Sequence, residues 1–258
     1  MEGVVVELKT AAEVQAMRAA GRVVADALAA VREAAVTGVT LKGLDAVAAA
    51  VIRDAGAEPV FLNYHPNWAP SPFPGVICAS VNDAVVHGIP GEYRLRDGDL
   101  VSIDCGARLA GWCGDAAVSF VVGTADPADV ALVEATEAAL AHGIAAARPG
   151  NRLGDIGAAI GLFARGAGYG MLADHGGHGI GRQMHEDPHV PNEGRVGKGM
   201  LLRPGMVIAI EPMLIADGTD DYRHEADGWT LRTATGARAA HSEHTVAIGT
   251  DGPEVLTR

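Results

Sequence analysis

The sequence is poor in aromatic residues and in cysteine. Phe, Trp and Tyr together make up 4% of the 258 residues, which predicts a core packed from aliphatic and small side chains. The three cysteines, Cys78, Cys105 and Cys113, are odd in number and lack the spacing of a metal site. They argue against a disulfide framework and indicate free thiols in a reducing cytoplasm.

Long apolar runs and basic stripes are lacking as well. No uninterrupted apolar run reaches about 18 residues, which argues against a membrane-spanning helix. The start, Met1-Glu2-Gly3, has neither the basic nor the apolar region of a secretory signal. With 20 basic and 32 acidic residues the net charge is −12, so we expect a cytoplasmic protein with no membrane and no direct nucleic-acid partner. The acidic balance suits a site that gathers carboxylates around cations.

Two pairs of helices are predicted from apolar periodicity and from their start and stop residues. The two pairs resemble each other at an offset of 112 residues: over residues 26–56, 11 of 31 positions are identical. Six of these matches are alanines, which an alanine-rich chain gives by chance, but the others include both turn glycines. We therefore favour an internal duplication over chance similarity. The predicted helices span residues 11–35, 41–55, 127–147 and 153–167.

Strands are predicted after each helix pair. Leu100–Ala107 alternates between apolar and polar residues and forms a hairpin with residues 112–122; Met206–Leu214 and Glu243–Ile248 are the strands of the second half. Val101-Ser-Ile-Asp104 and Ile208-Ala-Ile-Glu211 have the same form, so the duplication extends to the acids.

The predicted fold class is therefore α+β, with one catalytic domain over residues 1–258. Its two pseudo-symmetric ααβ halves, roughly 11–125 and 126–258, place an antiparallel sheet inside and helices outside.

Residues 62–75 depart from this regular pattern. This stretch holds four prolines and the rings of Tyr64, Trp68 and Phe73, together with His65, so it cannot be a helix or a central strand. A mere linker is one interpretation. Three large rings in an aromatic-poor chain favour the rim of a binding site.

Four acids lie on predicted strands. Asp104 and Asp115 lie on the two arms of the hairpin and can share one face, and Glu211 and Glu243 repeat this arrangement in the second half. Carboxylates at short range are costly unless a proton or a metal separates them. Four of them would balance two divalent cations, and oxygen ligands favour Mn, Co, Fe or Zn over soft metals.

Histidines gather in one glycine-rich segment. Four of the ten lie within residues 175–189, and the glycines around His178 would let a metal or a substrate approach. His185-Glu-Asp-Pro-His189 matches the H-E-x-x-H pattern of single-zinc proteases. That chemistry needs a helix, which Pro188 and the upstream glycines disfavour, so we reject this interpretation.

Five segments together resemble the type I methionine aminopeptidases, a metallopeptidase family with the pita-bread fold. Their order and spacing agree over nearly the whole chain. The segments are NDAVVHGIP (82–90), LVSIDCGARLAGWCGDAAVSF (100–120), GGHGIGRQMHEDPHVPN (176–192), IAIEPML (208–214) and SEHTVAI (242–248).

The resemblance implies a role for each matching residue. Two divalent ions (Co, Mn, Fe or Zn) would be held by Asp104, Asp115, His178, Glu211 and Glu243, with Asp115 and Glu243 bridging. His87 and His185 match catalytic histidines outside the ligand set, and Glu211 is the expected proton shuttle. The methionine pocket would be lined by Phe73, Cys78, Met184 and Trp229, with His87 and His185 also contacting the substrate.

The implied activity is removal of the initiator methionine from nascent proteins and peptides when the second residue is small. The partners would be these N-termini and, transiently, the ribosome, and we expect a monomer. Two alternatives stay open. Proline-specific peptidases share the fold and the ligands but usually add a whole N-terminal domain. A non-enzymatic binding module of this fold would typically have lost ligands.

Overall fold

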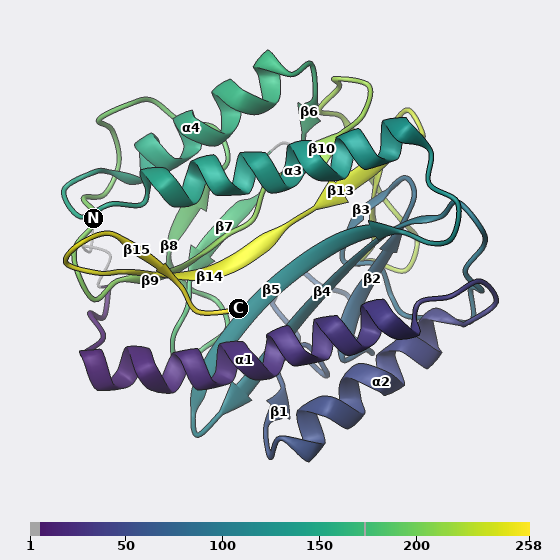
Figure 1. The fold of residues 1–258 in the computed structure, drawn as a ribbon, viewed down its shortest axis with the longest axis horizontal. Coiled ribbons are helices and arrows are strands. Elements are labelled where there is room, and N and C mark those ends of the chain that lie inside the picture. The colour runs from purple at the N-terminus through teal and green to yellow at the C-terminus, as the bar shows by residue number, and fades with distance from the viewer. Residues whose placement is uncertain (1–5, 173) are drawn as a thin grey trace.

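The computed structural model describes residues 6–172 and 174–258 (Figure 1). The start Met1-Glu2-Gly3 lies outside this part of the chain. Three helices begin at a residue whose side chain accepts a hydrogen bond from a free N–H of the first turn. Thr10 and Glu13 form a capping box on α1 (Ala11–Ala34), and Thr40 caps α2 (Leu41–Asp54). Asp126 caps α3 (Pro127–Ala146), and α4 covers Leu153–Gly166. The predicted helices are confirmed to within one residue at each end.

The helices repeat as the sequence predicts. Both α2 and α4 have 14 residues, and their starts differ by 153 − 41 = 112 positions. The turn before each of them uses a glycine with nearly the same positive φ, 93° at Gly38 and 91° at Gly150. Such a φ is costly for any residue with a Cβ, so the identical glycines mark the same backbone turn. The two halves are therefore pseudo-symmetric.

One large antiparallel sheet runs through both halves. Its main path in space is β1 (Glu58–Pro59), β4 (Leu100–Leu109), β5 (Trp112–Val121), β14 (Glu243–Ile248), β9 (Val207–Ile210), β7 (Gly176–Gly179) and β8 (Glu186–Pro191). β2 (Ile77–Val81) pairs with β4, and β15 (Pro253–Val255) pairs with β14. In Figure 1 the α1/α2 pair lies below and the α3/α4 pair above, with the strands between and behind them. This arrangement confirms the predicted α+β fold class.

Two small sheets border the large one. One contains β13 (Ala239–His241), β10 (Met213–Ile215) and β6 (Gly170–Met171); the other contains β11 (Tyr222–His224), β12 (Leu231–Thr233) and β3 (Ala84–Val86). The prediction of one strand over Met206–Leu214 is wrong. The chain leaves the large sheet after β9 and enters a small one at β10, because Pro212 has no N–H to donate to a ladder.

Different parts of the hydrophobic core are built from different types of side chain. Beneath α1/α2, and again beneath α3/α4, the buried side chains are almost all aliphatic or small, as the composition predicts. The buried aromatic and sulfur side chains Phe73, Cys78, Met184 and Trp229 instead gather in a third cluster. All three cysteines are free and buried. Within the described residues, no helix is long and apolar enough to cross a membrane.

Candidate metal centre and substrate pocket

Four acids meet on neighbouring strands of the large sheet. In the hairpin of β4 and β5, Asp115 pairs with Gly106 and Asp104 pairs with Ala117, so the two acids are diagonal neighbours on one face. Glu243 of β14 also pairs with Ala117, from the other side of β5. Glu211 follows β9, which pairs with β14. All four carboxylates line a single cavity.

Two of these acids, Asp115 and Glu243, are buried, and the other two are half-buried. Asp115 and Glu243 are 3% and 2% exposed, and one oxygen on each of them, and one on Asp104, accepts no hydrogen bond. Among the described residues, none of the four acids forms an ion pair with lysine or arginine. A buried carboxylate without a partner is costly, so this arrangement requires protons or a cation.

The pKa values of the acids reflect the same cost. Burial raises the pKa of Asp104 to about 7 and that of Glu211 to about 8. Burial also raises the pKa of Asp115 and of Glu243 far above the usual range, and the neighbouring carboxylates add to the effect. The metal-free chain therefore holds protons in this cluster, and a divalent cation would displace them.

His178 enters the cluster from β7 with one nitrogen free. Its Nδ1 lies 2.9 Å from the carbonyl oxygen of Gly179, which can only accept, so Nδ1 carries the proton. Its Nε2 lone pair then faces Asp115 Oδ2 at 3.9 Å and Glu211 Oε1 at 3.8 Å. Burial lowers the pKa of His178 to about 3, which keeps the ring neutral. This is the tautomer of a metal-binding imidazole.

The glycine next to His178 lets β7 lie close to β9. A Cβ on Gly177 would lie 2.0 Å from the carbonyl oxygen of Ala209, so no larger residue fits at this position. The glycine-rich sequence therefore brings the His178 imidazole against Glu211, which follows β9.

The ligand atoms form two overlapping groups. Asp115, His178 and Glu243 form one, and Glu211, His241 and Glu243 form the other; within each group the atoms lie within 4.8 Å of one another. Carboxylate oxygens and imidazole nitrogens are the donors that divalent first-row metals accept. The residues present therefore fit a divalent metal centre, with Glu243 common to both groups.

A cavity of about 390 Å³ leads to these groups. The four side chains predicted for the methionine pocket all line it: Phe73, Cys78, Met184 and Trp229. The rings of Tyr64, Trp68 and Phe73, from the loop at 62–75, line it too. The interpretation of this loop as a binding rim is thus favoured over a linker. Trp68 is 61% exposed, and its ring lies 5.0 Å from that of Trp229.

The two histidines predicted to meet the substrate also face this cavity. His185 Nδ1 lies 3.0 Å from the Tyr64 hydroxyl, and its ring centre lies 4.2 Å from that of His178. His87 follows β3 with a positive φ of 58°, which is uncommon for a residue with a side chain. Burial lowers the pKa of His87 to about 3 and that of His185 to about 4. Both rings are therefore neutral at physiological pH.

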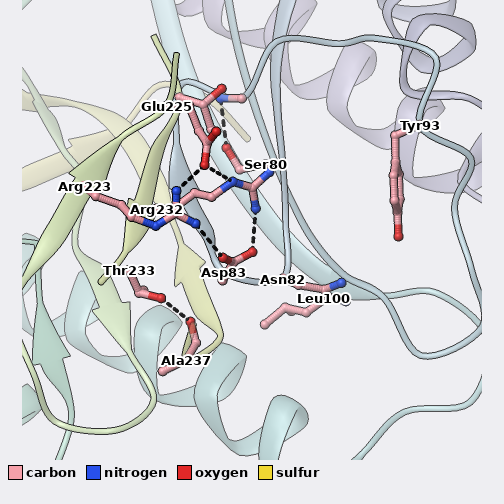
Figure 2. Close-up of polar contacts among 12 residues, drawn as sticks. Ser80, Asn82, Asp83, Tyr93, Leu100, Arg223, Glu225, Arg232, Thr233 and Ala237 are labelled. Carbon is pink, nitrogen blue, oxygen red and sulfur yellow. Dashed lines mark hydrogen bonds and ion pairs between the residues drawn. The ribbon is translucent and has the colours of Figure 1, made fainter. Parts of the chain in front are cut away.

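An ion-pair network braces the wall that carries His87 and Trp229. Figure 2 shows Arg223 and Arg232 lying between Asp83 and Glu225. The network ties the turn before β3 to β11 and β12. His87 directly follows β3, and Trp229 lies just before β12. Its indole N–H donates to the carbonyl of Ser71 at 3.1 Å, which joins the rim loop to the same wall.

Three histidines, His185, His189 and His241, bear on the type of metal site. His185 and His189 do not share a helix, because Glu186–Pro191 forms β8, so the rejection of a single-zinc protease motif is confirmed. His241, which the sequence analysis did not select, lies 3.5 Å from Glu211. No spacing in the sequence marks it, because His241 ends β13 and Glu243 begins β14, so the two residues lie on different strands.

Comparison with known proteins decides the family. The model of Metallopeptidase family M24 matches residues 15–250. The chain is 54% identical to methionine aminopeptidase 1 of Mycobacterium tuberculosis, over 98% of this chain and 95% of that protein.

The chain belongs to metallopeptidase family M24 and, within it, to the methionine aminopeptidases. It is also 42% identical to methionine aminopeptidase 1 of Bacillus subtilis, over 97% of this chain and 98% of the relative. The solved methionine aminopeptidase of Thermotoga maritima superposes with a TM-score of 0.93 at 38% identity, covering 98% of this chain and 100% of that one.

Prolidase from Pyrococcus furiosus has the same fold at 23% identity, with a TM-score of 0.78, and this chain covers 65% of it. The predicted family and pita-bread fold are confirmed, and membership of a metallopeptidase family means that the chain uses a divalent metal.

Proposed function

We propose that the chain removes the N-terminal methionine from nascent proteins and peptides whose second residue is small. The observation that carries this proposal is one cavity with a metal-binding floor and a sulfur-rich, aromatic wall. Four buried or half-buried carboxylates and His178 form the floor. Cys78 and Met184 lie in the wall beside Phe73 and Trp229, and such neighbours suit a thioether side chain.

The metal centre would hold two divalent ions, chosen from Co, Mn, Fe and Zn. Asp115 and Glu243 would be shared, Asp104 would bind one ion, and His178 with Glu211 would bind the other. When bound, such ions supply a water of lowered pKa and polarise the scissile carbonyl. The count of two is supported by the charge of the four carboxylates that line the cavity, which two divalent ions would balance.

The residues around the ions would handle the protons. Glu211, whose pKa burial raises to about 8, can take up a proton and release it near neutral pH. The Tyr64 hydroxyl can donate to His185 Nδ1, which leaves the proton of His185 on Nε2. That N–H would donate to the scissile carbonyl oxygen as negative charge develops there. His87 would contact the scissile amide nitrogen and hold the departing amine.

Two peptides distinguish this function from its alternatives. Met-Ala-Ser and Ala-Pro peptides are offered side by side to the metal-stripped and the metal-loaded protein. We expect free methionine from Met-Ala-Ser with metal only, and no cleavage of Ala-Pro. Cleavage of Ala-Pro instead would make the chain a proline-specific peptidase. No cleavage of either peptide with any of the four metals would favour a non-enzymatic binding module.

We further propose that residues 1–258 act as one catalytic domain with halves roughly 11–125 and 126–258. The domain would work as a monomer in the cytoplasm and associate transiently with the ribosome, where its nascent substrates emerge. The net charge of −12 disfavours a direct nucleic-acid partner. Sedimentation of the purified protein with and without ribosomes tests both the monomer and the association.

A further inference from the structure

His241 is a buried histidine beside the metal centre to which no role has been assigned above. It is the last residue of β13, pairs with Met213 of β10 and is 2% exposed. Its Nε2 is buried without a hydrogen-bond partner and lies 3.5 Å from Glu211 Oε2. A buried imidazole nitrogen without a partner is costly, so the position of this ring requires an explanation.

The backbone of His241 is fixed on the β4–β5 hairpin. Its N–H donates to Ser119 Oγ at 3.0 Å, and the same hydroxyl donates to its carbonyl oxygen at 2.8 Å. Ser102 Oγ lies 2.7 Å from Ser119 Oγ and completes the chain of hydrogen bonds. These contacts are all buried, so the ring of His241 is held towards Glu211 by the same strands that carry Asp104 and Asp115.

Glu211 lies between two imidazoles, one for each of its oxygens. His178 Nε2 faces Oε1 at 3.8 Å, and His241 Nε2 faces Oε2. The His178 nitrogen presents a lone pair, since the proton of that ring is on Nδ1. It therefore cannot donate to Glu211. His241 can, if its proton is on Nε2.

We propose that His241 is a positioning residue for Glu211. Its Nε2–H donates to Oε2, which holds the carboxylate in one orientation and leaves Oε1 for the ion beside His178. His241 is not among the residues that line the cavity, so it acts through Glu211 and not on the substrate. The inference rests on the proposed role of Glu211 as ligand and proton shuttle. Partners that orient a metal ligand typically change metal affinity or activity by about 10- to 100-fold.

Three variants test this role. His241→Leu removes the donor, His241→Gln keeps one, and His142→Gln changes an exposed histidine on α3 as a control. Manganese is titrated calorimetrically into each metal-stripped protein, and kcat and KM are measured on Met-Ala-Ser. We expect His241→Leu to bind the same number of ions as the parent. It should lose about 10- to 100-fold in manganese affinity or in kcat, with little change in KM. His241→Gln should recover most of the loss, and His142→Gln should match the parent.

Other outcomes would overturn the role. If both His241 variants bind one ion fewer, His241 is a ligand. If His241→Gln loses as much manganese affinity or kcat as His241→Leu, the hydrogen-bond donor is not what matters. If His241→Leu matches the parent in both quantities, His241 has no role in positioning Glu211. Should the parent fail to cleave methionyl peptides, the manganese titration still tests the inference separately from the proposed function.

A measurement on the unmodified protein covers the case in which a variant does not fold. Nitrogen-15 NMR of the zinc-loaded protein should show His241 neutral and protonated on Nε2. A metal-bound Nε2, or a proton on Nδ1, would contradict the proposal.

Discussion

Asp115 lies diagonally across the β4–β5 hairpin from Asp104, with both carboxylates on one face of the sheet. The two carboxylates differ in the other possible metal ligands that lie near them. Asp115 belongs to the group formed with His178 and Glu243, whereas no such group includes Asp104. The two acids of the hairpin should therefore contribute unequally to metal binding.

Substitution of each acid measures this difference. We expect Asp115→Asn to lose both ions and nearly all activity, because a shared ligand is removed. Asp104→Asn should weaken mainly one ion. Calorimetric titration of manganese into the two metal-stripped variants gives the stoichiometry directly. An unchanged stoichiometry in Asp115→Asn would be incompatible with a shared Asp115.

His87 and His185 should matter for turnover and not for metal binding. Both rings are neutral and face the cavity outside the proposed ligand set. His185→Ala and His87→Ala should each lower kcat by about 10²-fold or more, as is typical when a donor to a developing oxyanion is lost. Their manganese content should equal that of the parent. Loss of metal in either variant would make that histidine a ligand.

The raised pKa values predict how the metal-free protein responds to pH. Glu211 titrates near 8 in the folded chain, against a reference value of 4.5. The folded state then binds more protons than the unfolded state between these values, so the stability contributed by this group falls as pH rises from about 4 to about 8. Glu211→Gln removes this dependence.

Thermal unfolding of the metal-stripped proteins tests the sign. Glu211→Gln should match the parent near pH 5 and unfold at a temperature higher by a few degrees near pH 8.5. Its activity should be lost with any metal. A variant less stable than the parent at pH 8.5 would show that Glu211 is not under electrostatic strain in the metal-free chain.

The rim loop should set the second-residue preference. Large residues would overpack the space beside His87 and Trp68, which costs about 1–3 kcal/mol, and each 1.4 kcal/mol changes a rate about tenfold. We expect Met-Ala peptides to be cleaved at least ~10-fold faster than Met-Leu peptides. Met-Glu should be slower still, since it brings a further carboxylate to an acidic site.

Trp68→Ala is the matched variant for this preference. It should narrow the ratio between Met-Ala and Met-Leu and leave cleavage of Met-Ala largely unchanged. If the ratio does not move, the exposed indole plays no part in substrate choice.

Local patterns predicted most of the elements and the acids. Caps such as Thr10 and Thr40 act within one turn. The alternation around Asp104 reflects a strand with one apolar and one polar face, both largely buried. The break at Pro212 was also readable, since a proline inside a central strand is disfavoured, but the apolar run around it concealed the signal.

Long-range pairing decided what the sequence did not reveal. His241 faces Glu211 because β13 pairs with β10 and its backbone is held by Ser119 on another strand. Trp68 reaches the cavity because Trp229 holds the rim loop through the carbonyl of Ser71. Neither contact follows from spacing along the chain.

The most direct test of metal-dependent methionine removal is the release of free methionine from Met-Ala-Ser by three samples. The samples are the metal-stripped parent, the parent reloaded with manganese, and the Asp115→Asn variant treated with manganese in the same way. We predict methionine release from the reloaded parent alone. Equal release by the metal-stripped protein, or by reloaded Asp115→Asn, would contradict the assignment of the buried carboxylates as the catalytic metal centre.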